Sequence, residues 1–376
     1  MSLVARLARS VRQAHRASKR HGASPFRVVI RLAALLLSKG VRPADAIRYG
    51  LSDPRLPPGR LVGCIGKMRL RPLQRRLSPL EHDVLVGDKG LFYLFCRSLE
   101  IPIPRLLAIL DHPLSIRGSG ELLRGRGERE AFLARELPDE CVAKPARGSG
   151  GVGIRVLTRA PDGFQDDVSG ELFTPGQLCD VLRSPRRHPR VVLQERLHSH
   201  PELARLSGTT AVQAIRFNTL ITHDGTCRFA PARLKVIAGD QLIDNLGSGR
   251  AGNLVAFVGS GGLLAGAVAF AEDGVGLRWV ERHPRTGERF EGFRIPFFEE
   301  ALTLLGRVAP LFLPLRTIGW DVAITERGPC LVEGNSQWDP PNYVVPGQSS
   351  RPWEVEMGAF LDALRSEAAH SPVNAR

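Results

Sequence analysis

Apolar and basic residues recur with helical spacing at the start of the chain. The first apolar positions repeat every three or four residues on one face, and arginines cover the rest. This pattern predicts a basic amphipathic helix over residues 3–20. The apolar run FRVVIRLAALLL predicts a second helix over residues 25–38, ended by Gly40. Residues 52–80 are rich in Pro, Arg and Gly and predict a connecting segment.

From residue 81 onward, short apolar runs alternate with polar turns. Residues 88–99 predict a helix capped by Asp88, with an apolar face made of Leu91, Leu94, Phe95 and Leu99. Strands are predicted at residues 106–110, 141–144, 154–158, 191–195, 215–222, 228–237, 254–258 and 276–281. Further helices are predicted near residues 128–137, 175–183 and 297–308, and a hairpin at 320–333. This mixture indicates an α+β fold with antiparallel sheets, divided into residues 1–80, 81–196 and 197–376.

Positive charge is concentrated at one end of the chain. Residues 1–80 hold 18 Lys and Arg but only two acids, whereas the remaining residues hold 34 Lys and Arg against 36 Asp and Glu. A nucleic-acid footprint over the whole molecule is therefore excluded, and the scarcity of aromatic residues in the first 80 argues against nucleic acid as a partner there too. The helix at residues 1–20 either contacts a membrane surface or packs as a solvated cap.

Composition indicates a globular protein of a reducing compartment. Apolar content is 43% and charged content 24% of the 376 residues. The six cysteines lie far apart without zinc spacing, so we expect reduced thiols, with Cys141 and Cys330 buried in strands, and a cytoplasmic location with the inner membrane surface as an alternative. No apolar run reaches the length of a transmembrane helix.

The hairpin GWDVAITERGPCLVEGN carries the first candidate site. Counting outward from Arg327 places Asp321 opposite Glu333, so both carboxylates face the same side of the sheet, and Asn335 follows on that side. Two facing carboxylates repel each other unless a cation lies between them. Hard oxygen ligands of this kind suit Mg²⁺. The alternative is a surface hairpin with solvated acids.

The glycine-rich stretch AKPARGSGGVGI carries the second candidate site. Its GSGGVG matches a dinucleotide fingerprint, but that motif requires a following helix, and the chain continues as the strand-like IRVLT. A strand, a glycine loop and a second strand form a hairpin whose backbone N–H groups can bind phosphates. Lys144 precedes the loop and can reach the same phosphates. A plain glycine-rich turn is the alternative.

Basic residues within apolar strands form the third candidate site. Arg216 lies between Ile215 and Phe217, and the two-residue spacing of Arg233 and Lys235 places both on one face. These cations could meet a phosphate or a substrate carboxylate. A solvated sheet face is the alternative. The segment at residues 244–253, DNLGSGRAGN, has the composition of a substrate loop.

With these motifs in order, the chain resembles the ATP-grasp superfamily, in particular the sugar-transfer-associated branch. The resemblance covers residues 80–345. It rests on the ordered segments DK at 88–89, KPARGSGGVG at 144–153, QER at 194–196, HPELARL at 200–206, IRFNTL at 215–220, DNLGSGRAGN at 244–253, GWDVA at 319–323 and LVEGN at 331–335. It implies two α+β subdomains whose antiparallel sheets clasp ATP, preceded here by a basic helical segment.

The resemblance also implies roles for individual residues. ATP phosphates would be bound by Lys89, Lys144 and a mobile loop containing Gly148, Ser149, Gly150, Gly151 and Gly153. Adenine would be bound at Gln194, Glu195 and the backbone to Leu197, and ribose by Glu202. Asp321, Glu333 and Asn335 would bind one or two Mg²⁺ ions, with Mn²⁺ as an alternative. Arg216 would stabilise the transferred phosphoryl group, with Lys235 and Arg233 as further catalytic residues.

Two departures from the family pattern concern the substrate end: Gln213-Ala214 replace an Asn-Thr pair, and Gly249-Arg250 replace Gly-Gly. The implied function is an ADP-forming ligase that activates a carboxylate as an acyl phosphate and joins it to an amine, in surface-polysaccharide or peptide-type biosynthesis. The family's name alone supplies the polysaccharide link. The alternatives are a phosphotransferase acting on a hydroxyl group and a non-catalytic ATP-binding or membrane-surface protein.

Overall fold

The computed structural model describes most of the chain and places its strands in two sheets. The described residues are 3–111, 114–148, 150–182, 190–240, 242–244, 252–340, 342–344 and 352–371. Within them the strands form two eight-stranded sheets, and every strand pairing is antiparallel. The predicted α+β fold with antiparallel sheets is confirmed.

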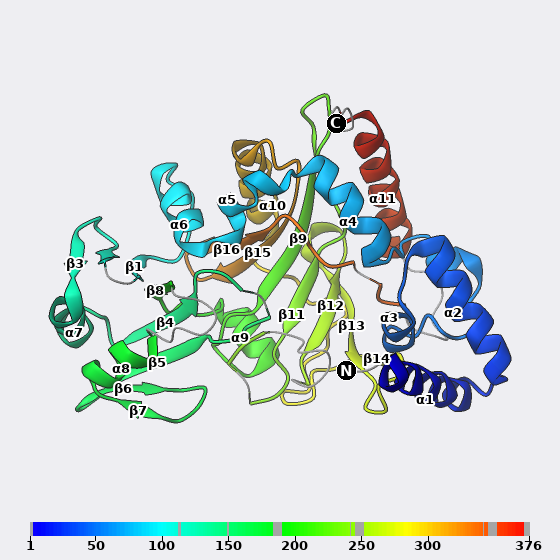
Figure 1. Ribbon diagram of the computed structural model, residues 1–376, viewed down its shortest axis with the longest axis horizontal. Helices are drawn as coiled ribbons and strands as arrows, with labels where there is room; N and C mark the ends of the chain where they lie inside the picture. Colours follow the sequence, from blue (N-terminus) through cyan, green and yellow to red (C-terminus); the bar gives the residue numbers. More distant parts are fainter. Residues whose placement is uncertain are drawn as a thin grey trace.

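The first sheet has the strand order β3-β2-β1-β8-β4-β5-β6-β7 and lies at the left of Figure 1. Its strands are β1 (Leu106–Leu110), β2 (Leu114–Arg117), β3 (Leu122–Arg124), β4 (Glu140–Pro145), β5 (Arg155–Ala160), β6 (Gly163–Asp166), β7 (Leu172–Phe173) and β8 (Val191–Glu195). Helices α7 (Gly125–Arg135) and α8 (Pro175–Leu182) cover it. Phe132 and Leu178 from these helices share one buried cluster with Leu157 and Leu193 from the sheet.

The second sheet has the order β14-β13-β12-β11-β9-β15-β16, and β10 pairs with β9. Its strands are β9 (Ala214–Ile221), β10 (Cys227–Phe229), β11 (Arg233–Val236), β12 (Leu254–Val258), β13 (Leu264–Phe270), β14 (Leu277–Val280), β15 (Thr317–Thr325) and β16 (Gly328–Asn335). Helices α6 (Lys89–Ser98) and α10 (Phe298–Val308) share the largest buried cluster with one face of this sheet. The short helices α5 (Val84–Gly87) and α9 (Pro201–Ser207) complete this part of the fold.

The N-terminal helices lie at the opposite end of the molecule from the first sheet (Figure 1). Helix α1 (Leu3–His21) and helix α2 (Pro25–Lys39) have the predicted bounds to within one residue. The Ser24 hydroxyl accepts a hydrogen bond from the Arg27 N–H at the start of α2, and Gly40 ends it in the left-handed conformation. Helix α3 (Pro43–Arg48) follows.

The predicted connecting segment at residues 52–80 is wrong in one respect, because it contains helix α4 (Lys67–Leu77). Pro72 lies inside this helix, where it removes one backbone hydrogen bond. Leu70 and Leu77 are buried in a cluster shared with the C-terminal helix α11 (Pro352–His370). This long-range packing stabilises α4 although its internal proline disfavours a helix.

Two further expectations differ from the structure. The single strand predicted at residues 228–237 is split into β10 and β11, because Pro231 between them has no N–H to donate to the ladder. Helix α6 buries Phe92, Tyr93 and Cys96, whereas Leu91 and Leu99 of its predicted apolar face are exposed. The helix lies against β8 and β16, which selects the face containing Tyr93.

No helix in the described ranges is long and apolar enough to span a membrane. All six cysteines are free, and Cys141 and Cys330 are buried as the sequence predicts. Burial raises the pKa of both thiols to about 12, so neither is a thiolate at neutral pH.

Candidate functional site

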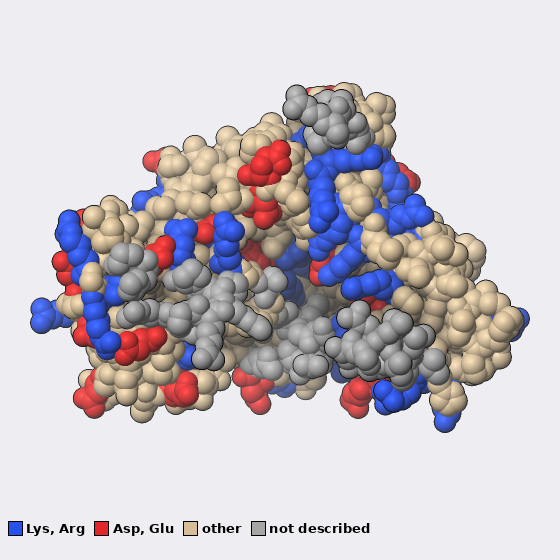
Figure 2. Space-filling view, viewed as in Figure 1, with Lys and Arg blue, Asp and Glu red and all other residues tan. Residues whose placement is uncertain are grey.

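A cleft of about 720 Å³ lies between the two sheets. One wall is the face of the second sheet opposite α10, and the facing wall comes from β4, β8 and the glycine loop of the first sheet. The far end of the cleft is the end next to the N-terminal helices. It is lined by residues of α3 and α4 and by the residues just before these two helices. Figure 2 shows a hollow in the middle of the molecule, with Lys and Arg side chains gathered over α4 beside it. The cleft is therefore strongly basic.

Strand alternation explains why basic residues of β9 and β11 face the cleft. Ile215, Phe217, Leu234 and Val236 belong to the buried cluster with α10. The intervening residues Arg216, Arg233 and Lys235 project to the opposite face and line the cleft. The pairing of Arg233 with Arg216 across β11 and β9 brings all three cations together. The sequence pattern predicted the shared face only for Arg233 and Lys235.

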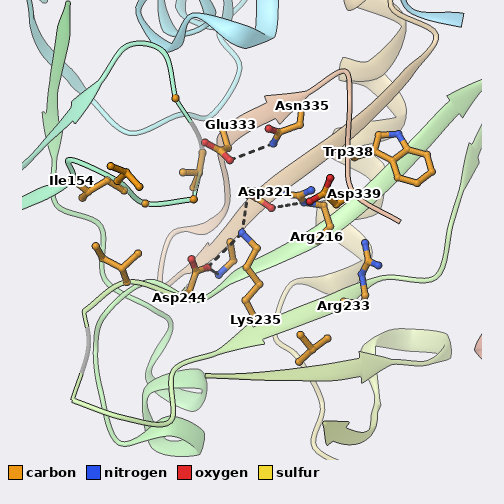
Figure 3. Close-up of a pocket in the computed structure, with 18 of the residues that line it drawn as sticks. Ile154, Arg216, Arg233, Lys235, Asp244, Asp321, Glu333, Asn335, Trp338 and Asp339 are labelled. Atoms are coloured by element: carbon orange, nitrogen blue, oxygen red, sulfur yellow. Dashed lines mark hydrogen bonds and ion pairs between the residues drawn. The ribbon is translucent and has the colours of Figure 1, made fainter. Parts of the chain in front are cut away.

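Asp321 on β15 is the counter-ion of this cluster. Arg216 Nε and Nη2 donate to the two Asp321 carboxylate oxygens at 2.7 and 3.0 Å, and Lys235 Nζ donates to Oδ2 at 2.9 Å. Arg216 and Asp321 are direct partners across β9 and β15. Figure 3 shows both basic side chains pointing at the Asp321 carboxylate. The bidentate contact fixes the orientation of the guanidinium group.

Burial and charge act in opposite directions on these groups. Burial raises the pKa of Asp321, but Arg216 and Lys235 outweigh that effect and hold its pKa well below the usual range. Burial lowers the pKa of Arg216 and of Lys235, and the nearby carboxylates outweigh it and raise both. All three groups are therefore charged at neutral pH.

Glu333 and Asn335 lie beside Asp321. Asp321 pairs with Glu333 across β15 and β16, and Asn335 Nδ2 donates to Glu333 Oε1 at 3.3 Å. Lys89 Nζ lies 3.5 Å from Glu333 Oε2 and donates to the Gly148 carbonyl at 3.2 Å. Lys89 therefore connects the carboxylate pair to the glycine loop.

This donor set fits Mg²⁺. The described residues contain no cluster of three or more His, Cys, Asp or Glu side chains suited to a metal. Asp321 and Glu333 provide two carboxylates on one face and Asn335 an amide oxygen. Mg²⁺ commonly takes one or two carboxylates and completes its shell with phosphate oxygens and water. The three residues could hold such an ion next to a bound triphosphate.

Lys144 occupies the opposite wall and is almost fully buried. Its Nζ donates to the Tyr93 hydroxyl at 2.6 Å, and that hydroxyl lies 2.7 Å from Gln194 Oε1 and 2.9 Å from the Val332 carbonyl. Burial, together with the nearby Lys89, lowers the pKa of Lys144 to about 7. An anion bound beside Lys144 would raise this pKa, so that the amino group takes up a proton.

The glycine loop turns through left-handed backbone conformations. Gly148, Gly150, Gly151 and Gly153 all have positive φ angles, which residues with a Cβ adopt at a cost. Gly148, Gly150 and Gly151 line the cleft, whereas Gly153 packs near Pro145. Ser149 lies outside the described residues. The backbone groups of this loop face the same space as Lys89.

The predicted adenine and ribose residues are less closely grouped. Gln194 and Leu197 line the cleft. The Glu195 side chain turns outward, where Oε1 accepts from the Arg105 N–H at 2.9 Å. Glu202 is exposed, pairs with Arg205 at 2.9 Å and is not among the residues that line the cleft. The ribose role of Glu202 stays a prediction.

Two residues of the site, Tyr93 and Asp244, were not singled out from the sequence. Tyr93 joins Lys144 to Gln194, but its helix was expected to bury another face. Asp244 opens the predicted substrate loop, where its Oδ2 accepts from the Ala214 N–H at 2.8 Å and lies 4.0 Å from Lys235 Nζ. Burial raises the pKa of Asp244. Residues 245–251 of that loop lie outside the described residues.

Two antiparallel sheets around a cleft, with a glycine loop on one side and a carboxylate hairpin on the other, define a protein of the ATP-grasp class. A family model described as "Sugar-transfer associated ATP-grasp" matches residues 69–351, well over half of the chain. The chain therefore belongs to the sugar-transfer associated ATP-grasp family. No curated protein matched it by sequence.

Solved structures show a distant likeness. D-alanyl-alanine synthetase A from Vibrio cholerae has 11% identity and a TM-score of 0.39, over 77% of this chain and 67% of that one. D-alanine–D-alanine ligase from Helicobacter pylori has 13% identity and a TM-score of 0.41, over 76% and 61%. Phosphoribosylamine–glycine ligase from Thermotoga maritima has 13% identity and a TM-score of 0.41, over 77% and 57%. This chain thus spans between 57% and 67% of these three relatives.

Proposed function

We propose that the protein is an ATP-dependent, ADP-forming ligase that joins a carboxylate to an amine, using Mg²⁺. The observation that carries the proposal is the convergence of Lys89 and Lys144 on one wall with Arg216, Lys235 and the Asp321–Glu333 pair on the other. A triphosphate between these walls would meet cations on both sides. The family's description associates it with sugar transfer, from which we infer a substrate in surface-polysaccharide synthesis, and a peptide-type substrate is the alternative.

The reaction proceeds in two displacements. A carboxylate oxygen of the substrate attacks the γ-phosphorus, the bond to the β-phosphate oxygen breaks, and ADP leaves. The amine nitrogen then attacks the acyl phosphate carbon, loses a proton, and displaces inorganic phosphate. Phosphoryl transfer of this kind depends on alignment and charge neutralisation more than on covalent chemistry by the protein.

The residues of the chain divide this task. Lys89 and Lys144 bind the phosphates from the loop side, and the glycine loop supplies N–H donors. Arg216, held in place by Asp321, stabilises the charge that develops on the transferred phosphoryl group. Bound Mg²⁺, held by Asp321, Glu333 and Asn335, would neutralise phosphate charge. This route requires no nucleophilic side chain from the protein.

The test is a substrate screen that measures ADP release. Full-length protein with Mg-ATP and a panel of carboxylates and amines should release ADP only when both partners are present. Asp321→Asn should abolish the release, and Asp162→Asn, on an exposed turn, should leave it unchanged. Release of AMP and pyrophosphate would exclude the acyl phosphate. A stable phosphoester in the ³¹P spectrum would instead establish a phosphotransferase.

A further inference from the structure

The far end of the cleft carries unbalanced positive charge. Basic side chains from the N-terminal segments and β11 line it, namely Arg42, Arg48, Lys67, Arg71 and Arg233. The acids that line the same end are Asp45 and Asp339. Arg42 pairs with Asp45 at 2.9 Å, and Lys67 and Arg71 share Asp339 at 2.7 and 2.9 Å. Both acids are therefore already paired.

Arg48 and Arg233 are left without a counter-ion. Neither side chain makes an ion pair or a hydrogen bond within the described part of the chain. Arg233 is only 7% exposed, and both burial and the neighbouring Arg216 disfavour its charge. A buried guanidinium group without an anion costs free energy, whereas a bound carboxylate or phosphate would offset that cost. Figure 3 shows Arg233 set apart from the Asp321 contacts, on the side of Trp338.

One aromatic surface supports both arginines. Arg48 lies 6.0 Å from the Phe270 ring centroid, and Arg233 lies 5.7 Å from that of Tyr343. Tyr49 packs between these rings, at 5.6 Å from Phe270 and 5.5 Å from Tyr343. Rings that support a guanidinium group from one side leave its N–H groups free for an anion. The arrangement thus holds two unpaired donor groups over one continuous apolar surface.

We propose that this end of the cleft is a subsite for a substrate with more than one oxyanion group, bound through Arg48 and Arg233. The inference rests on the proposed function, because it describes the substrate that faces the γ-phosphate. Carboxylate and phosphate groups share the recognition chemistry, since both accept paired N–H donors from arginine. The aromatic surface receives the apolar or ring portion of the same molecule. The N-terminal helices are then part of the active site.

The test is calorimetric binding of two probes, tripolyphosphate and citrate, to the full-length protein saturated with Mg-ADP. Saturation fills the nucleotide site, so binding reports on the remaining space. We expect one or both probes to bind, and Arg48→Gln and Arg233→Gln each to weaken the binding about tenfold or more, as expected for losing a charge-assisted hydrogen bond. Arg228→Gln and Arg278→Gln, both exposed on the second sheet, should leave it unchanged.

The outcomes separate the two proposals. Failure of Mg-ADP to bind would contradict the proposed function itself. Normal Mg-ADP binding with no probe binding, or with binding that Arg48→Gln and Arg233→Gln do not weaken, would overturn the subsite alone. Tight binding of tripolyphosphate but not citrate would assign a phosphorylated substrate, and the reverse a polycarboxylate. Thermal unfolding of each variant checks that the fold is intact. Arg48 is the last residue of α3 and only partly buried, so its substitution should disturb the fold less than that of the buried Arg233.

Helix α2 carries a second, independent feature, because it is apolar on two opposite faces. Val28, Leu32 and Leu35 pack into the N-terminal core. The other face exposes Phe26 at 73% and Leu37 at 74%, with Val29 and Ile30 between them. An exposed apolar stripe of this length on a surface helix indicates an interaction site. Figure 1 shows α2 at the outer edge of the molecule, away from both sheets.

Basic residues surround the end of this stripe. A groove at the C-terminal end of α2 is lined by Lys39, Arg69, Arg76 and Arg365, and by the exposed Met68. The described lining of this groove contains no carboxylate. Arg69 Nη2 donates to the Leu37 carbonyl at 2.7 Å, which places its charge beside the apolar stripe. An apolar face flanked by Lys and Arg is the pattern of a helix lying in a membrane interface.

We propose that α2 lies on an anionic lipid bilayer, with Phe26, Ile30 and Leu37 in the acyl boundary and the basic groove at the headgroups. The four cations that line the groove beside the stripe, with no carboxylate among the groove's described residues, favour an anionic lipid surface over a purely apolar protein partner. The membrane contact predicted for residues 1–20 stays a prediction, and the exposed apolar face lies on α2 instead.

Vesicle co-sedimentation tests this contact. The protein should pellet with phosphatidylcholine–phosphatidylglycerol vesicles and much less with phosphatidylcholine alone. Phe26→Gln with Leu37→Gln should reduce binding about tenfold or more, since two apolar side chains leave the bilayer. Leu172→Gln, 67% exposed on β7, is the matched control. Absence of pelleting at low ionic strength would overturn the proposal, as would a dimer on gel filtration that the double variant converts to a monomer.

Discussion

Asp321 faces Glu333 across the β15–β16 hairpin because of a β-bulge. From the turn inward, Thr325 pairs with Gly328 and Val322 with Leu331, and the register then shifts by one residue. If the register of Val322 and Leu331 continued without a shift, Asp321 would oppose Val332, and Glu333 would oppose the buried Trp320 and face the core. The bulge therefore puts the second carboxylate into the cleft, a common use of bulges next to functional sites.

Glu333→Gln should therefore weaken the binding of Mg²⁺ that supports nucleotide binding. Loss of one of two carboxylate ligands should raise the half-saturating Mg²⁺ concentration roughly tenfold or more. A Mg²⁺ titration at fixed fluorescent nucleotide measures this shift. Glu326→Gln, exposed at the turn of the same hairpin, is the control and should behave as wild type. Equal Mg²⁺ dependence in both variants would remove Glu333 from the metal site.

Tyr93→Phe should destabilise the protein by removing the hydrogen-bond acceptor of Lys144. The buried Lys144 amino group would lose its contact at 2.6 Å, and Gln194 would lose a partner. We expect a loss of about 1–3 kcal/mol in the free energy of unfolding, the cost of an unsatisfied buried polar group. Denaturant unfolding measures it. Tyr49→Phe serves as control, because no hydrogen bond of its hydroxyl occurs in the described residues, and should change stability by under ~0.5 kcal/mol.

Nucleotide binding near pH 8 should take up a proton at Lys144. Its pKa of about 7 leaves the amine mainly neutral at that pH in the free protein. Bound phosphates favour the charged form and raise the pKa, so a proton enters on binding. Titration calorimetry of Mg-ADP in buffers of different ionisation enthalpy measures the number of protons. Lys144→Met should abolish the uptake, whereas Lys67→Gln, at the far end of the cleft, should retain it.

Lys144 also gives stability a defined pH dependence. Its folded pKa lies below the value of 10.5 for an unperturbed lysine, so the unfolded chain binds more protons between pH 7 and 10.5. In that window the Lys144 contribution to stability rises with pH, by at most about 1.4 kcal/mol per unit. Unfolding of wild type and Lys144→Met across this range should converge as pH rises. Parallel curves would show an ordinary lysine pKa.

Much of the site could be predicted from local pattern alone. Alternation in ARLKVI and in the segment around Arg216 predicted which side chains leave the core, because each strand has one face packed under α10. The opposition of Asp321 and Glu333 came from a symmetric count about Arg327. That count gave the right pair although the register shifts within the hairpin, which no local pattern encodes. The metal role of the pair stays a prediction.

Other parts depend on contacts between distant segments. The face of α6 that carries Tyr93 is set by β8 and β16, which lie about a hundred or more residues further along the chain. Helix α4 contains Pro72 and is stabilised by its packing against α11. Arg42, Arg48 and Arg71 at the far end of the cleft come from a region that the sequence marked only as basic, whereas Arg233 was identified from its strand. Propensity and periodicity carry no information on such pairings.

Removal of either partner of the buried Arg60–Glu354 pair should be strongly destabilising. Arg60 donates to both Glu354 oxygens, at 2.7 Å for the shortest contact, and both side chains are almost fully enclosed. Glu354→Ala would remove the carboxylate that the buried Arg60 guanidinium group contacts through Nε and Nη2, and should cost roughly 3–5 kcal/mol. Thermal and denaturant unfolding measure it. Arg60→Met combined with Glu354→Met should be less harmful than the single change. If the losses in the free energy of unfolding of the two single variants added up to that of the double variant, the two charges would not stabilise each other.

The same pair joins the start of the chain to its end. Ile65 exchanges backbone hydrogen bonds with the Asn342 side chain, and Ser371 Oγ donates to the Arg76 carbonyl. During synthesis the N-terminal segment leaves the ribosome long before these partners exist. Its final packing must wait until helix α11 has emerged. A chain without α11 would leave α4 and the arginine-rich end of the cleft without their packing partner, so this end of the cleft would assemble after the strands of both sheets.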